Sequence, residues 1–201
     1  MSPTGKVSDA ESTQQSTCIL PPNTNFESAN RRFLFTMSNR TSYKFVLHGS
    51  RKECGVLDAP FKELIAGTTN NPSELYMRGY KTDFSLYGVT YTLEFRILEA
   101  DDKDTNYRLN IFIGIGEATQ NYFGWYICAT NELILSPKKW FRAIDSKTDY
   151  NRVKTDYKDR VLNKGGKHDL RASCDQLKLN IEMITDNQAY STPTMIIKDM
   201  I

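Results

Sequence analysis

The fold is decided by residues 88–116, which read GVTYTLEFRILEADDKDTNYRLNIFIGIG. Apolar side chains occupy every second position from Val89 to Ile97, with threonine, glutamate and arginine between them. The alternation returns from Tyr107 to Ile115, after a polar stretch at 101–106 that is typical of a turn. A period of two indicates strands with one buried face, so the sequence predicts an antiparallel hairpin of two long strands.

The same period marks further strands on both sides of this hairpin. Residues 33–37 and 43–47 are predicted to form an opening hairpin, and later strands are predicted at 122–129, 132–135, 177–183 and 195–197. This gives seven or eight strands that mostly follow one another in a meander. Such connections favour an antiparallel sheet.

Helix signals are fewer. Asp58 is placed to cap a short helix that ends at Gly67, and Asn71-Pro72 is placed to start another that ends before Gly79. Residues 147–163 predict an amphipathic helix, because Tyr150, Val153, Tyr157 and Val161 share one face. The predicted fold class is therefore β-dominant α+β: a mainly antiparallel curved sheet or sandwich of seven to eight strands, with two short helices and one late amphipathic helix.

The composition predicts one globular domain with a polar extension. The chain has 201 residues, of which 39% are hydrophobic and 25% charged. Residues 1–30 are rich in Ser, Thr, Gln, Asn and Pro, so we interpret them as a flexible polar N-terminal arm before a single β-rich domain at 31–201. No apolar run of membrane-spanning length and no secretory signal is seen, which predicts a cytoplasmic or other intracellular location, including association with a virion, and not secretion. The sequon Asn39-Arg40-Thr41 is accordingly interpreted as chance.

Motifs for enzyme chemistry are missing. The four cysteines (Cys18, Cys54, Cys128 and Cys174) lack the close pairing of a zinc knuckle, so no metal or other cofactor is predicted. The only imidazoles, His48 and His168, are not accompanied by a recognisable serine or cysteine nucleophile signature. We therefore predict a non-enzyme, and a Cys/His-dependent hydrolase assembled in space is a distant alternative.

One basic region stands out against a nearly neutral chain. Residues 138–171 hold eleven Lys and Arg and five Asp, a net charge of +6, whereas the whole chain carries +2. Cations next to aromatic rings suit an anionic membrane surface or the phosphates and bases of RNA, in a non-specific way. The predicted anionic-surface residues are Lys138, Lys139, Trp140, Arg142, Arg152, Lys154, Lys158, Arg160, Lys164 and Lys167. The alternative is an ordinary solvated basic helix beside two core aromatics.

Two hydrophobic features predict contact between copies of the chain. Ile19 and Leu20 form the one apolar knot of the arm, and the aromatic run at 122–126 places rings on both faces of a strand. We predict self-association through Ile19, Leu20, Tyr122 and Trp125; for the aromatic run, the alternative is a packed central strand.

The leading functional prediction is a non-catalytic structural or scaffold protein. It would form a homo-oligomer and bind an anionic surface, either a membrane or a nucleoprotein, in the manner of a viral matrix subunit. The alternative is a soluble β-sheet module that binds a partner protein or a small ligand. No motif in the sequence decides between them.

Overall fold

A computed structural model describes residues 20–58, 63–82, 88–116, 121–129, 161–164, 168–186 and 188–201. These residues form thirteen strands and one short helix. The helix is α1 (Thr24–Ser28). The strands are β1 (Arg32–Arg40), β2 (Lys44–Cys54), β3 (Val56–Asp58), β4 (Glu63–Leu64), β5 (Ser73–Tyr80), β6 (Val89–Leu98), β7 (Asp104–Ile115), β8 (Tyr122–Ala129), β9 (Val161–Lys164), β10 (His168–Cys174), β11 (Leu179–Thr185), β12 (Tyr190–Ser191) and β13 (Thr194–Asp199).

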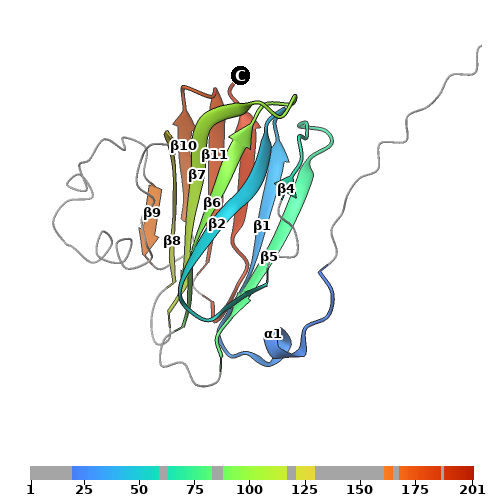
Figure 1. Ribbon diagram of the computed structural model, residues 1–201. Helices are drawn as coiled ribbons and strands as arrows, with labels where there is room; N and C mark the ends of the chain where they lie inside the picture. Colours follow the sequence, from blue (N-terminus) through green and yellow to red (C-terminus); the bar gives the residue numbers. More distant parts are fainter. Residues whose placement is uncertain are drawn as a thin grey trace, which may run out of the picture.

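The strands form two sheets that lie face to face (Figure 1). Sheet A has the order β10-β11-β13-β1-β5-β3, with β12 beside β1, and sheet B has the order β4-β2-β6-β7-β8-β9. Most pairs are antiparallel, but β1 runs parallel to both β12 and β13. The protein is thus β-dominant with mixed sheets, as the sequence predicts at that level, while the number of strands exceeds the seven or eight expected.

The core fills the space between the two sheets. Phe33, Phe35 and Met37 of β1 are fully buried and face Leu93 and Phe95 of β6 across one continuous hydrophobic cluster. The alternation identified from the sequence therefore marks the inward positions. The outward positions of β6 are buried as well, because Thr90, Thr92 and Glu94 are each less than 8% exposed. The prediction of one exposed face on this strand was wrong.

The central hairpin is confirmed. Strands β6 and β7 pair antiparallel, with Leu93 opposite Ile111 and Phe95 opposite Leu109. The turn is shorter than predicted, because β7 already begins at Asp104. A register shift follows Arg96, and Asn106 adopts a positive φ of 61° there, a conformation that asparagine tolerates better than most residues.

The predicted opening hairpin was wrong. Strands β1 and β2 belong to different sheets, so residues 41–43 carry the chain from sheet A to sheet B. Asn39 holds this corner, because its Nδ2 donates to the carbonyls of Tyr43 and Ile65 at 2.6 and 2.8 Å. Its Oδ1 accepts from the backbone N–H and the hydroxyl of Thr41. The polar stretch taken for a hairpin turn is a crossing between layers.

The structure contradicts both predicted short helices, because the described residues of these segments form the strands β4 and β5. The Asn71-Pro72 signal precedes β5, in which Leu75 and Met77 face the core at alternate positions. A period of two over eight residues prevails over a capping signature. Asp58 ends β3 and pairs with Arg78 across the sheet, and the chain forms β4 soon after it at Glu63–Leu64.

The late helix lies mostly outside the described residues. Its last predicted turn does not, because Val161–Lys164 form β9, which pairs antiparallel with β8. The end of that prediction was therefore wrong. The strand candidate at 132–135 also lies outside the described residues.

Part of the predicted flexible arm, residues 1–30, is structured, because α1 lies within residues 20–30. Asn23 caps α1 by accepting from the N–H of Phe26, and Phe26 is only 4% exposed. Residues 1–19 lie outside the described part of the chain. The division into arm and domain near residue 30 stays a prediction.

Candidate functional site

Most of the predicted basic surface lies outside the described residues. This applies to Lys138, Lys139, Trp140, Arg142, Arg152, Lys154, Lys158, Arg160 and Lys167. Lys164 is the last residue of β9, the strand that ends sheet B. The role of this region stays a prediction.

The residues predicted for self-association lie in different places. Ile19 is outside the described residues and Leu20 is half-buried. Tyr122 and Trp125 belong to β8, which has a neighbouring strand on each side. Trp125 is 1% exposed and is part of the core, so a contact between copies through its side chain would require the core to open.

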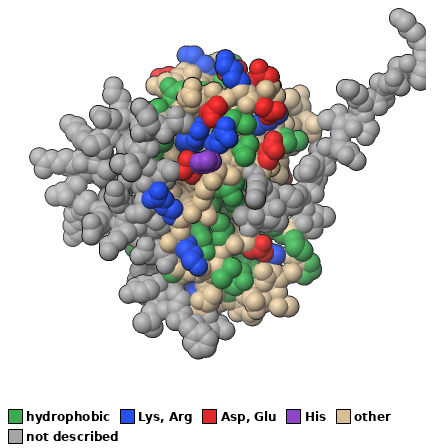
Figure 2. Space-filling model, in the orientation of Figure 1, with side chains coloured by type: hydrophobic (Ala, Val, Ile, Leu, Met, Phe, Trp, Pro, Cys, Tyr) green, Lys and Arg blue, Asp and Glu red, His purple; other side chains and the backbone are tan. Residues whose placement is uncertain are grey.

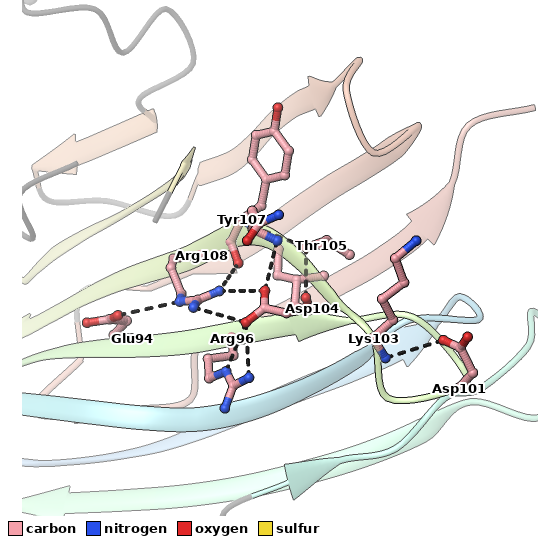
Figure 3. Close-up of polar contacts among 10 residues, drawn as sticks. Glu94, Arg96, Asp101, Lys103, Asp104, Thr105, Tyr107 and Arg108 are labelled. Atoms are coloured by element: carbon pink, nitrogen blue, oxygen red, sulfur yellow. Dashed lines mark hydrogen bonds and ion pairs between the residues drawn. The ribbon is translucent and has the colours of Figure 1, made fainter. Parts of the chain in front are cut away.

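Charged side chains gather on the outer face of sheet B, near the turn between β6 and β7 (Figure 2). Arg108 donates to both carboxylate oxygens of Asp104 at 3.0 and 3.1 Å, and its Nε lies 3.9 Å from Glu94. Arg96 donates to the same Asp104 at 3.0 and 3.2 Å. Figure 3 shows the four groups pointing toward one another from β6 and β7. We call Glu94, Arg96, Asp104 and Arg108 the charged network.

The charged network is neutral in total, with two guanidinium groups and two carboxylates. The hydrogen bonds from Arg108 are the main cause that lowers the pKa of Asp104 from 3.8 to about 2. Asp104 therefore stays ionised across the physiological range and holds the two strands together. Because the charges of the network balance one another, ion pairing between β6 and β7 explains the network without a ligand.

A second cluster lies at the other end of the molecule, where α1 packs on the outer face of sheet A (Figure 1). The ring of Phe26 meets Tyr80 edge-on at 6.3 Å and Tyr190 edge-on at 5.9 Å. Two guanidinium groups lie over these rings: Arg32 is 4.6 Å from the centre of Tyr190 and 5.4 Å from that of Phe26, and Arg78 is 5.5 Å from Phe26. We call Phe26, Arg32, Arg78, Tyr80 and Tyr190 the aromatic–arginine cluster.

Sheet register brings this cluster together. Arg32 lies opposite Tyr80 in β5 and opposite Tyr190 in β12, and the next outward position of β5 is Arg78. The inward neighbours, Phe33 and Gly79, contact each other so closely that a Cβ at Gly79 would lie 2.4 Å from the Phe33 ring. The outward side chains are therefore fixed by the tight packing beneath them.

The two arginines differ in how their charge is balanced. Arg78 is 5% exposed and forms an ion pair of 2.7 Å with Asp58, whose Oδ2 also accepts from Asn23. Arg32 donates through Nη1 to the backbone carbonyls of Phe26 and Glu27 at the end of α1, and it forms no ion pair with any described carboxylate. Its Nε is buried and has no hydrogen-bond acceptor within the described part of the chain.

Arg32 therefore lies partly covered beside Tyr190, which is 41% exposed. A guanidinium that no carboxylate neutralises attracts anionic groups, and the exposed aromatic ring beside it adds an amphipathic contact surface. Sequence reasoning missed this site, because Phe26 lies in the predicted arm and Arg32 and Tyr190 are far apart in the chain. The only signal was a lone phenylalanine in a polar segment.

Among the described side chains, no group of three or more His, Cys, Asp or Glu is arranged to hold a metal ion. In the same part of the chain, no helix has the length and apolar character of a membrane span.

Comparison with known proteins identifies the fold. No family model and no curated protein matches this sequence. The crystal structure of the lipid binding protein Nakanori is similar with a TM-score of 0.58 and 10% sequence identity, over 84% of this chain and 71% of that one. The RahU protein, solved in complex with a TRIS molecule, aligns over 87% of this chain and 98% of its own at 5% identity, with a TM-score of 0.40. The protein thus shares the fold of Nakanori.

Proposed function

We propose that this protein is a non-catalytic β-sheet module that binds the surface of lipid membranes containing anionic headgroups. The observation that carries the proposal is the aromatic–arginine cluster, in which the partly exposed Arg32 has no carboxylate partner and lies beside the exposed Tyr190. The fold supports it, because a protein described as lipid binding has the same architecture. Fold likeness alone would be analogy, so the chemistry of the cluster is essential to the argument.

The chemistry of the cluster fits the boundary between water and lipid. Tyrosine is enriched at the headgroup level, where its ring contacts apolar groups and its hydroxyl stays in water. A basic side chain near an anionic surface contributes about 1 kcal/mol of attraction. Tyr190 and Arg32 supply both on neighbouring strands.

The basic region at 138–171 is proposed to add non-specific attraction to the same kind of surface. Its net charge of +6 is the largest local excess in the chain. The further predictions are that copies of the chain associate on the membrane in the manner of a viral matrix subunit, and that the protein acts inside cells. They rest on the sequence features given above.

Vesicle flotation tests the proposed function. The full chain is mixed with vesicles of phosphatidylcholine, either alone or with phosphatidylserine, and the bound fraction is measured against salt. We expect stronger flotation with phosphatidylserine and a decrease in binding as salt increases, because exposed charges are screened. If neither vesicle floats the protein while an RNA oligonucleotide binds it, the partner is a nucleic acid and the proposal is wrong.

The absence of catalysis is tested separately. We expect His48→Gln and His168→Gln to leave membrane binding unchanged and to remove no turnover, because no nucleophile signature accompanies either imidazole. A hydrolytic activity of the purified protein that either substitution abolishes would show that it is an enzyme.

A further inference from the structure

We infer that residues 188–192, the loop that carries Tyr190, form the part of the protein that enters the headgroup region of the membrane. The inference rests on the proposed function and assigns the contact to one loop whose shape is fixed within the protein. It follows from the exposure of Tyr190, from the absence of charge along this stretch of sequence, and from the hydrogen bonds that hold the loop.

Tyr190 is presented to solvent on an ordered part of the loop. Ser191 is fully buried against β1, while the residues on either side of it are exposed. The ring of Tyr190 lies beside the guanidinium of Arg32 and meets Phe26 edge-on, yet the residue stays 41% exposed. The loop therefore offers an aromatic surface that faces water and is already held in position.

No charged side chain lies along this stretch. From 187 to 197 the sequence contains no Asp, Glu, Lys or Arg. Removing a charge from water costs far more than removing an amide or hydroxyl group, so an uncharged loop enters the headgroup region most readily. Tyrosine adds a favourable contact there, since its ring lies among apolar groups while its hydroxyl stays in water.

Hydrogen bonds fix the shape of the loop from two sides. The carboxylate of Asp186 accepts from the backbone N–H groups of Gln188 and Thr192 at 3.0 and 2.9 Å. Asn121, just before β8, donates through Nδ2 to the carbonyls of Asp186 and Gln188 at 3.3 and 2.9 Å. Because the loop is already ordered, little conformational entropy is lost when it meets the membrane. Asp186 and Asn121 are thus positioning residues for Tyr190.

Ile65 provides a matched control at the end of the molecule opposite α1, where it follows β4 (Figure 1). It is 45% exposed, which is close to the value for Tyr190. Its carbonyl accepts from Asn39, which lies seven residues along β1 from Arg32, a separation of roughly 23 Å. Its surroundings differ, because the exposed Glu63 lies two residues before it. The pair separates a contact made by the loop from the general affinity of exposed apolar side chains for lipid.

Flotation with vesicles of phosphatidylcholine and phosphatidylserine compares the two positions. We expect Tyr190→Ala to weaken binding about fivefold, because the contact of the ring is lost. Tyr190→Phe, which keeps the ring, and Ile65→Ala should each stay within about twofold of the unmodified protein. The loss in Tyr190→Ala should persist at high salt, because a ring contact is not screened as a charge is. Equal binding by Tyr190→Ala and Ile65→Ala would overturn the inference.

Asp186 tests the fixed shape of the loop, because general electrostatic attraction predicts the opposite result. Asp186→Asn removes a negative charge, so attraction to phosphatidylserine alone would make binding stronger. We expect binding that is instead about threefold weaker, since an amide has one acceptor oxygen where the carboxylate uses two. Asp175→Asn removes the same charge at the other end of β11 and should bind at least as tightly as the unmodified protein.

The salt dependence separates positioning from a loss of folded protein. In Asp186→Asn the binding should decrease more steeply with salt, because the ring contact is weakened and the attraction between charges remains. A smaller folded fraction would instead weaken binding equally at every salt concentration. That result, or binding by Asp186→Asn equal to or stronger than that of the unmodified protein, would contradict the inference.

Paramagnetic broadening locates the contact in the unmodified protein. Bicelles of the same two lipids carry a spin label on the headgroup, which broadens the NMR signals of nearby backbone amides. We expect the signals of Ala189 and Tyr190 to broaden and those of Ile65 and Gly67 to stay sharp. Broadening at Ile65 equal to or greater than that at Ala189 would refute the inference even if every variant unfolds.

The same measurements distinguish the two levels of the argument. If the unmodified protein binds neither vesicles nor bicelles, the proposed function fails. If it binds while the signals of Ala189 and Tyr190 stay sharp, only this inference fails.

Discussion

The substitution Asn39→Ala is expected to cost about 4 kcal/mol of folding free energy. Asn39 is fully buried, and its amide makes four hydrogen bonds: to the carbonyls of Tyr43 and Ile65, and from the N–H and hydroxyl of Thr41. Four bonds of about 1 kcal/mol each set the magnitude. The alanine would leave backbone groups of Thr41, Tyr43 and Ile65 without these partners at the crossing between the sheets.

Equilibrium unfolding in urea measures this loss. For a chain of this size, 4 kcal/mol corresponds to a decrease in Tm of about 10 °C. Asn39→Asp keeps the shape but points a carboxylate oxygen at two carbonyls, so we expect it to be at least as destabilising at neutral pH. Asn70, in the loop between β4 and β5, is exposed, and Asn70→Ala should change the stability by less than about 0.5 kcal/mol.

A second change probes the same corner from another segment. Gly67 donates its N–H to the carbonyl of Thr41, and a Cβ at Gly67 would lie 2.2 Å from the carbonyl oxygen of Asn39. Gly67→Ala should therefore destabilise the protein without removing any hydrogen-bonding side chain.

A small effect of Asn39→Ala would refute the reasoning. If the free energy of unfolding of this variant lies within about 1 kcal/mol of that of the unmodified protein, the hydrogen bonds of Asn39 contribute little to stability.

Three further predictions follow from the described contacts and from the sequence. Because the pKa of Asp104 is lowered to about 2, its ion pairs stabilise the fold fully above pH 4, and this stabilisation is lost as the pH falls from 4 through 2. Asp104→Asn should therefore cost about 1–2 kcal/mol at pH 7, allowing for solvent screening, and much less at pH 2, as measured by urea unfolding at both pH values. Phe26→Ala should release α1 and cost about 3 kcal/mol, seen as faster proteolysis near residues 24–30. Deletion of residues 1–20 should leave Tm nearly unchanged. Charge reversal in the basic region, by changing Lys154, Lys158 and Lys164 to Glu, should weaken vesicle binding by at least about tenfold. Equal binding by this variant and the unmodified protein would show that the region is only a solvated surface.

The sequence predicted those elements whose signal is local. The β6–β7 hairpin combines a strict period of two with a polar turn, and both come from neighbouring residues. The position of β8 and the alternation of β11 followed in the same way. Where a strand pairs with a distant one, the sequence held no comparable signal, and β1 lies between β5 and β13 instead of beside β2.

The failed helix predictions have a common cause. Caps are short signals, and both Asp58 and Asn71-Pro72 carry one. The side chain of Asp58 instead pairs with Arg78, and the residues after Pro72 place Leu75 and Met77 in the core of a sheet. Burial of a whole strand face outweighs the roughly 1 kcal/mol of a cap.

The candidate site could not be predicted for a geometric reason. Arg32 and Tyr190 become neighbours only because β12 runs parallel to β1, and Phe26 reaches them only through α1. No spacing in the chain encodes such a meeting. The basic region was visible because charge excess is a local property, which explains why the sequence directed attention there and not to the cluster.

The two ends of the molecule differ in how completely their polar groups are used. At the β6–β7 turn, Arg96 and Arg108 are balanced by Asp104 and Glu94, so a ligand would have to break existing bonds to enter. At the α1 end, Arg32 has no ion-pair partner among the described carboxylates, and its guanidinium lies over the rings of Phe26 and the exposed Tyr190. Groups that are fixed in place by the fold but not satisfied by it are the ones that gain most from a ligand, because the cost of ordering them is already met within the protein. This difference in charge balance favours the α1 end of sheet A over the β6–β7 turn for the membrane contact that we propose.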